Sequence, residues 1–85
     1  MKQNRRPRLE SLWLLAANLK RLREARGYTQ IDLARRTGLP NGYISKIERE
    51  LMNVSLANLD ALAAGLDCSL TDLFMPVRAG SQEQP

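Results

Sequence analysis

The side chains of this sequence that could do chemistry are mostly cationic, and they are concentrated in its first half. Residues 1–49 hold twelve Lys or Arg and four Asp or Glu, a net charge of +8, whereas residues 50–85 have a net charge of −4. The whole chain therefore has a net charge of +4. Clustered guanidinium and ammonium groups bind phosphates, so this distribution favours nucleic acid as a partner. The structural alternative is a row of charges on a solvated helix face.

Enzymatic chemistry is poorly supported, because the side chains that usually perform it are missing. The chain has no histidine, so the commonest general base and metal ligand is absent. Its single cysteine, Cys68, has no histidine with which to form a nucleophilic dyad and no second cysteine for a disulfide. The five glycines are isolated, so there is no glycine-rich phosphate loop. We therefore expect no catalytic residue, no metal site, no cofactor and no small-molecule ligand.

The length of the chain, 85 residues, leaves room for one domain with a modest core. We expect a disordered basic arm at residues 1–8, a folded domain at residues 9–76 and a disordered tail at residues 77–85. No apolar run approaches the roughly eighteen residues that a membrane helix needs, and no secretory signal is visible. These features predict a cytoplasmic protein that does not enter a membrane.

Residues 30–37 have the pattern of a short helix with a signal at each end. Thr29 is a good N-cap, and Asp32 follows at the spacing of a capping box. Gly38 stands where a helix would end with a residue at positive φ. The sequence therefore predicts a helix that begins at Gln30 and ends at Thr37.

A second short helix is predicted at residues 41–49, after a turn. Pro40 suits the start of a helix, and Ile44 and Ile47 form an apolar stripe within it. Two helices that cross steeply over a short turn need a small side chain at the crossing, and Ala34 supplies it. Residues 30–49 are therefore expected to form a helix-turn-helix.

Three further helices are predicted from apolar spacing and caps. A first helix at residues 9–25 would bury Leu12, Leu15, Leu19 and Leu22 and stop at Gly27. Another would begin after the N-cap Ser55, bury Leu56, Leu59, Leu62, Ala63 and Leu66, and be limited by Gly65. A short last helix would begin with the capping pair Ser69 and Asp72 and stop at Pro76.

The spacing in residues 30–49 resembles the helix-turn-helix of bacterial and phage repressors. The longer segment LKRLREARGYTQIDLARRTGLPNGYISKIER is similar to the lambda-repressor-like family, also called the Xre family. The resemblance extends from about Leu15 to Phe74. It implies an all-α fold, in the form of a compact five-helix lambda-repressor-like DNA-binding domain. The segment Asn53-Val54-Ser55-Leu56 is also similar to controller proteins of restriction–modification systems.

The resemblance implies which residues meet DNA. It places the base-reading positions on Asn41, Gly42 and Lys46. An asparagine can bond adenine and a lysine can donate to guanine, whereas a glycine permits close approach. The implied backbone contacts are Gln30, Arg35, Arg36, Tyr43, Ser45 and Arg49. Of these, Gln30 would bind a phosphate with its amide at the start of the first motif helix.

Two structural contacts are implied in the same way. Arg23 and Glu48 are expected to form a buried ion pair, because a buried charge is costly without a partner. Leu73, Phe74 and Met75 are expected at a dimer interface, with ordinary core packing as the alternative. The family usually has a glycine where this chain has Glu50. Leu51 and Met52 follow it, and they form either a patch for another chain or part of the core.

These observations predict a sequence-specific, double-stranded-DNA-binding transcriptional regulator. It would act as a homodimer on a pseudo-palindromic operator, with the helix at residues 41–49 in the major groove. The alternative is an antitoxin or another protein-interaction module that retains a DNA-binding domain. The short tail contains few apolar residues, which argues against this alternative. The basic arm is either a second DNA contact or a solubilising terminus.

Overall fold

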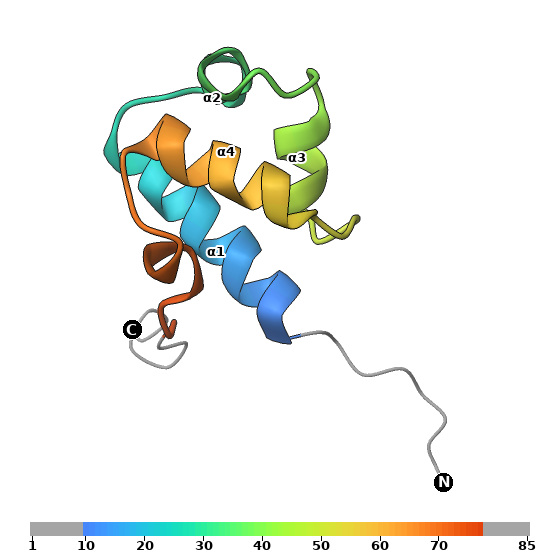
Figure 1. Cartoon of the computed structure of the whole chain (residues 1–85), viewed down its shortest axis with the longest axis vertical. Coiled ribbons are helices and arrows are strands. Elements are labelled where there is room, and N and C mark those ends of the chain that lie inside the picture. Colours follow the sequence, from blue (N-terminus) through green and yellow to red (C-terminus); the bar gives the residue numbers. More distant parts are fainter. Residues whose placement is uncertain (1–9, 78–85) are drawn as a thin grey trace, which may run out of the picture.

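The computed structural model describes residues 10–77, and this part of the protein is all-α (Figure 1). Its elements are α1 (Glu10–Ala25), α2 (Gln30–Thr37), α3 (Tyr43–Glu48), α4 (Leu56–Leu66) and one 3₁₀ turn, η1 (Thr71–Phe74). The predicted fold class is therefore confirmed. The expected number of helices is wrong, because the described residues hold four α-helices and the predicted last helix is only the turn η1. The basic arm and residues 78–85 of the tail lie outside the described residues.

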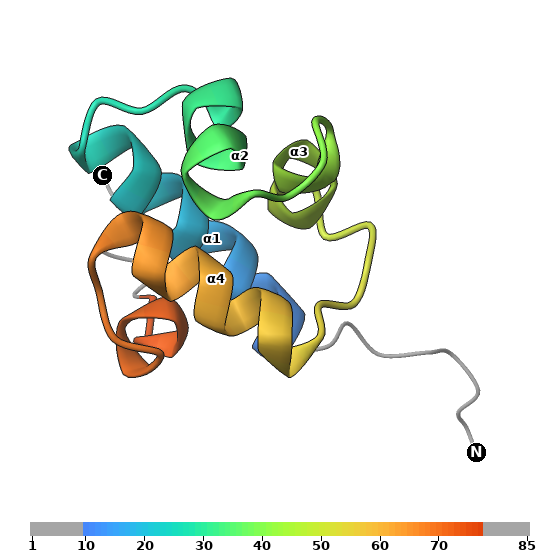
Figure 2. The ribbon, with the colours of Figure 1, turned by 45° about the horizontal axis from the view of Figure 1, so that its top comes forward.

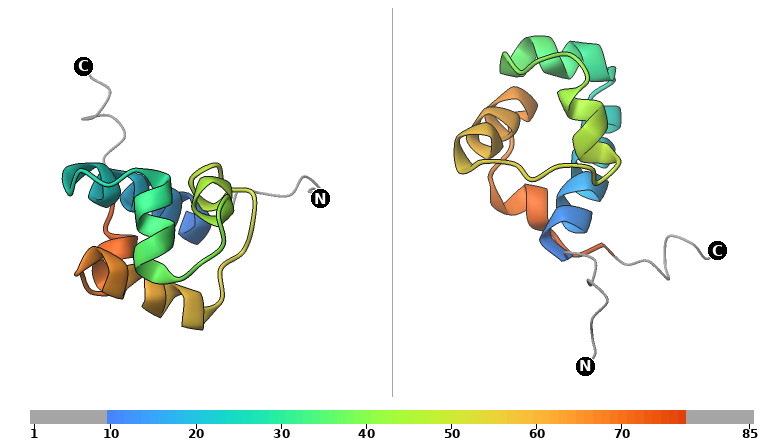
Figure 3. Two further views of the ribbon diagram at one scale, coloured as in Figure 1. Left: turned by 90° about the horizontal axis from the view of Figure 1, so that it is seen from above. Right: turned by 90° about the vertical axis from the view of Figure 1, so that its right-hand side faces the viewer.

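The helices are arranged so that α2 and α3 both remain at the surface. α1 packs against α3 and η1, while α2 packs against α3 and α4. Figure 2 shows α2 and α3 next to each other with steeply inclined axes. In the right-hand view of Figure 3, α2 lies across one end of the molecule, above α3 and α4. The two motif helices are thus supported from below by α1 and α4.

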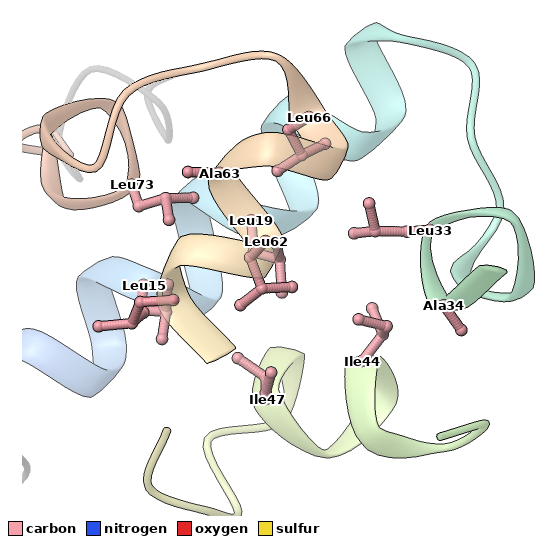
Figure 4. Packing of buried hydrophobic residues seen from close by; sticks show 11 residues of the cluster. Leu15, Leu19, Leu33, Ala34, Ile44, Ile47, Leu62, Ala63, Leu66 and Leu73 are labelled. Carbon is pink, nitrogen blue, oxygen red and sulfur yellow. The ribbon is translucent and has the colours of Figure 1, made fainter. Parts of the chain in front are cut away.

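One apolar cluster joins all five elements (Figure 4). Its buried members are Leu15, Leu19, Leu33, Ala34, Ile44, Ile47, Leu59, Leu62, Ala63, Leu66 and Leu73. The predicted burial of Leu56 is wrong, because this residue is 78% exposed, and Ile31 on α2 is also 55% exposed. Ile31 is the second residue of α2 and Leu56 is the first residue of α4, so each lies in the first turn of its helix. Apolar spacing alone does not distinguish these exposed positions from buried ones.

The ends of α2 confirm the predicted local signals. The Thr29 hydroxyl accepts a hydrogen bond from the Asp32 N–H at 2.9 Å, and the Asp32 carboxylate accepts one from the Thr29 N–H at 2.8 Å. The hydrogen bond from the Thr29 backbone lowers the pKa of Asp32. Gly38 ends the helix with a φ of 77°. Ser55 likewise caps α4, by accepting from the Asn58 N–H at 3.1 Å.

Gly65 does not limit α4, contrary to the prediction. The helix continues to Leu66 and ends at Asp67, which adopts a left-handed φ of 56°. A Cβ atom at position 65 would lie 2.7 Å from the Cγ2 atom of Thr37 on α2. The glycine therefore permits the close approach of α2 to α4, and its function is in packing.

Asn18 is a buried polar residue that explains why the last helix is only one turn. Its amide nitrogen donates to the carbonyls of Leu73 at 3.2 Å and Met75 at 2.9 Å, and also to that of Leu14. Its amide oxygen accepts from Arg21 at 2.8 Å. The carbonyls at the end of η1 thus bond to a side chain of α1 in place of the next helical turn, and Pro76 follows directly.

Arg23 and Glu48 lie in contact and join the end of α1 to the end of α3. The Nε atom of Arg23 donates to Oε2 of Glu48 at 2.7 Å, and Nη2 donates to Oε1 at 3.1 Å. The two side chains are 10% and 6% exposed. The hydrogen bond to Glu48 raises the pKa of Arg23. The remaining guanidinium nitrogen, Nη1, donates to the Tyr28 carbonyl at 2.8 Å.

Replacing Asp67 with glycine should stabilise the domain. A side chain at left-handed φ is strained, and a negative charge at a helix C-terminus opposes the helix dipole. Asp67→Gly should therefore raise the free energy of unfolding by about 0.5–1 kcal/mol. Ala64→Gly, at an exposed position inside the same helix, should lower it by about 1 kcal/mol. Urea denaturation of both variants measures whether the free energy of unfolding changes in opposite directions. A change in the same direction for both would contradict the assignment of Asp67 as the end of α4.

Removing Arg23 should destabilise the domain strongly. Arg23→Ala leaves the Glu48 carboxylate buried without its cation, which should cost about 3–5 kcal/mol. Lys20→Ala, on the exposed side of the same helix, should change stability by no more than about 0.5 kcal/mol. Thermal melts of the two variants make the comparison. Similar melting temperatures would mean that Glu48 reaches water when Arg23 is removed.

Candidate nucleic-acid interface

The turn between α2 and α3 places two of the expected base-reading residues before the helix. The Tyr43 N–H donates to the Pro40 carbonyl at 3.1 Å, which closes a tight turn with Gly42 as its third residue. Gly42 has a φ of 87°, a conformation that favours glycine at this place. α3 therefore begins at Tyr43, and the predicted start at Asn41 was too early.

The three expected base-reading positions, Asn41, Gly42 and Lys46, are all exposed. Lys46 lies one helical turn after Gly42, with its N–H donating to the Gly42 carbonyl at 3.0 Å, so these two share one side of the element. Ile44 and Ile47 point the other way, into the core. The apolar anchors of α3 thus leave Lys46 pointing away from the protein.

The expected backbone-contact residues are in different environments. Arg35 and Arg49 are exposed, whereas Gln30, Tyr43 and Ser45 are half-buried. The Gln30 amide nitrogen donates to Oε1 of Glu48 at 3.0 Å. The Tyr43 hydroxyl accepts a hydrogen bond from the Asn58 amide at 2.7 Å, and this contact ties α3 to α4. Nothing in the sequence pattern signalled the role of Asn58, because its partner is distant along the chain.

Arg36 is exposed, but its guanidinium group contacts other parts of the protein. Its Nε atom donates to the Gly65 carbonyl at 2.7 Å, and its guanidinium carbon lies 4.7 Å from the centre of the Tyr28 ring. The hydrogen bond attaches α2 to the end of α4 and satisfies a carbonyl near a helix terminus. Arg36 therefore contributes to the packing of these helices, and its expected contact with a phosphate stays a prediction.

The expected dimer residues separate into buried and exposed members. Leu73 is 0% exposed and belongs to the core, so its assignment to an interface between protomers is wrong. The reason is the inward-facing position of Leu73 on η1, against α1. Phe74 is half-buried against the core, and Met75 is 43% exposed. Of the other two apolar residues, Met52 packs against the core while Leu51 is exposed.

The charge of the described part differs from that of the whole chain. Residues 10–77 hold eight Lys or Arg and eight Asp or Glu, so their net charge is zero. Residues 10–49, with the first three helices, have a net charge of +4, and residues 50–77, with α4 and η1, have a net charge of −4. The positive excess of the whole chain therefore comes from residues 1–9.

Neither a metal cluster nor a membrane-spanning helix occurs among residues 10–77. No cluster of three or more His, Cys, Asp or Glu that could hold a metal ion occurs among them. None of their helices combines the length and the apolar character that a bilayer crossing requires. Cys68 is partly buried beside the core, and this burial raises the pKa of its thiol.

Comparison with known proteins gives matches across the described domain. The chain is 36% identical over 63 residues to a hypothetical transcription factor of Neisseria meningitidis serogroup B, covering 74% of this chain and 59% of that protein. The structure of the restriction–modification controller protein C.AhdI from Aeromonas hydrophila matches with a TM-score of 0.73 and 38% identity, over 78% of this chain and 100% of that one. The controller protein C.Esp1396I, solved as a tetramer with its natural 35-base-pair operator, matches with a TM-score of 0.69 and 34% identity, over 75% of this chain and 84% of that one.

The family assignment rests on the segment that contains the motif. The HTH_3 family model, described as helix-turn-helix, matches residues 19–73. This range includes α2, α3 and α4 together with the second half of α1, from Leu19 to Ala25. The chain therefore belongs to the HTH_3 helix-turn-helix family, the Xre-type regulators that residues 19–49 resembled.

Proposed function

We propose that this protein is a sequence-specific transcriptional regulator that binds double-stranded DNA through α3 in the major groove. The observation that carries the proposal is the division of α3 into two sides. Ile44 and Ile47 are buried, while Lys46 is exposed one turn after the exposed Gly42. A helix held in this way presents a polar side to base edges. The similarity to a controller protein solved on its operator supports the same function.

Each exposed position has a defined chemistry toward DNA. Lys46 would donate to guanine O6 and N7, and Asn41 would bond the N6 and N7 edge of adenine. Gly42, without a side chain, would let the backbone approach the groove. The contacts to phosphates or sugars, which would fix the register of α3, would come from Gln30, Arg35, Arg36, Tyr43, Ser45 and Arg49. With only two reading side chains in each protomer, the shape of the DNA should contribute to specificity.

We further propose that two protomers bind a pseudo-palindromic operator as a homodimer. A single six-residue recognition helix reads few base pairs, so a second copy is needed for useful specificity. The half-sites would lie about one helical turn apart, roughly 34–36 Å. Phe74 and Met75 form the candidate interface, because they follow the buried Leu73 and are not fully covered.

Lys46 and Arg35 should leave different signatures in DNA binding. Lys46→Ala should cost about 1–3 kcal/mol at the preferred base and relax the preference at one position in each half-site. Arg35→Ala should weaken binding to every sequence and lower the slope of log K against log salt by about one. Titration of both variants against a duplex library at two salt concentrations separates the signatures. A uniform loss for Lys46→Ala would make Lys46 a phosphate contact.

The proposed homodimer can be tested by sedimentation of the wild-type chain and of a variant that should dissociate it. At micromolar concentration the wild-type chain should sediment as a dimer, about twice the 9.6 kDa of one chain. Met75→Glu should shift it toward the monomer, because a charge would be buried in an apolar contact. Leu56→Glu, at a more exposed apolar residue on α4, should not. A wild-type monomer would contradict the homodimer, and dissociation by Leu56→Glu alone would move the interface to α4.

A further inference from the structure

The carboxylate of Glu48 joins the buried ion pair to a residue proposed to contact DNA. It accepts hydrogen bonds from Nε and Nη2 of Arg23 at 2.7 and 3.1 Å, and from Nε2 of Gln30 at 3.0 Å. Gln30 is the first residue of α2, and its side chain is half-buried. The three side chains therefore form a continuous chain from the inside of the protein to the start of the motif.

The chemistry of this contact fixes the orientation of the Gln30 amide. An ionised carboxylate can only accept hydrogen bonds, whereas an amide has a donor end and an acceptor end. The NH₂ group of Gln30 must therefore face Glu48, because the flipped amide would place two oxygens together. One of the two N–H bonds of that nitrogen is then used by Glu48, and the other remains a donor.

Arg23 contributes to the same arrangement in two ways. Its guanidinium neutralises the Glu48 carboxylate, so this anion can lie beside a residue that approaches DNA phosphate. Its Nη1 atom also holds the Tyr28 carbonyl at 2.8 Å, two residues before Gln30. One guanidinium thus fixes both the backbone that leads into α2 and, through Glu48, the side chain at its first position.

We propose that Arg23 and Glu48 are positioning residues for a contact with DNA. They orient the Gln30 amide so that its second N–H donates to a DNA phosphate. This inference rests on the proposed DNA-binding function. It gives the ion pair a task beyond stability, because the carboxylate decides which end of the amide is available. Neither residue of the pair needs to touch DNA.

A double-mutant cycle on DNA affinity tests the proposal. Gln30→Ala should weaken binding to a mixed-sequence duplex roughly tenfold, the loss of one hydrogen bond to a charged group. Glu48→Gln preserves the shape of the side chain but no longer dictates the orientation of the amide. It should weaken binding by a similar factor when Gln30 is present and have little further effect in the Gln30→Ala background. Equal losses in both backgrounds would overturn the proposal, because the pair would then act on α3 as a whole.

A structural control separates positioning from stability. Asn18→Ala removes a buried amide whose hydrogen-bond partners are Leu14, Arg21, Leu73 and Met75, and not Gln30 or Glu48. It should lower the melting temperature, and any effect it has on affinity should simply add to that of Gln30→Ala. If Asn18→Ala and Gln30→Ala were coupled in DNA affinity as strongly as Glu48→Gln and Gln30→Ala, the proposal would also be overturned.

A second variant tests the site if Glu48→Gln does not fold. Gln30→Lys places an ammonium group at the same half-buried position, where it can bond Glu48 and a phosphate together. It should retain affinity for mixed-sequence DNA and steepen the slope of log K against log salt by about one. An unchanged slope would mean that position 30 does not meet a phosphate, and the inference would fail. Absence of DNA binding by the wild-type chain would instead refute the proposed function itself.

Discussion

The contact between Arg23 and Glu48 is the interaction on which the placement of the motif depends. Two charges are tolerated away from water only when each satisfies the other, so the ends of α1 and α3 must lie at one separation. α3 has only six residues, too few to be stable through its own hydrogen bonds. Its conformation is instead imposed from outside: by the ion pair at its end, by two buried isoleucines, and by the bond from Asn58 to Tyr43 at its beginning.

Features determined by neighbouring residues were predictable from the sequence. The caps at Thr29 and Ser55 and the stop at Gly38 each depend on residues within a few positions, and all three occur as predicted. The tight turn before α3 is equally local, yet it was missed, because Pro40 was read as a helix start. Positive φ at Gly42 makes residues 40–43 a turn, and two polar residues therefore precede the helix.

Features determined by distant packing were not predictable. Glycine is a residue type that often ends a helix, so Gly65 was expected to limit α4. Its role in packing depends on Thr37 of α2, which is distant along the chain. Leu73 and Met75 are similar in sequence character, but one is inside the core and the other is exposed. The carbonyl partners of Arg36 and Asn18 likewise lie far along the chain. Asn18 did offer a signal, as a polar residue between Leu15 and Leu19 on the buried stripe of α1.

Within residues 10–77, the positive charge of residues 10–49 and the negative charge of residues 50–77 affect how this part of the protein would approach a polyanion such as DNA. With no net charge, it experiences little overall attraction toward DNA, but its positive and negative halves experience a torque. This torque acts only within about one Debye length, roughly 10 Å at 0.1 M salt. At that distance the half with α4 and η1 would be repelled by DNA, and the half with the motif would turn toward it. In the proposed encounter with DNA, the acidic residues of the half with α4 and η1 would disfavour contacts made by the wrong face, and they would shorten the encounters in which α3 points away from the groove.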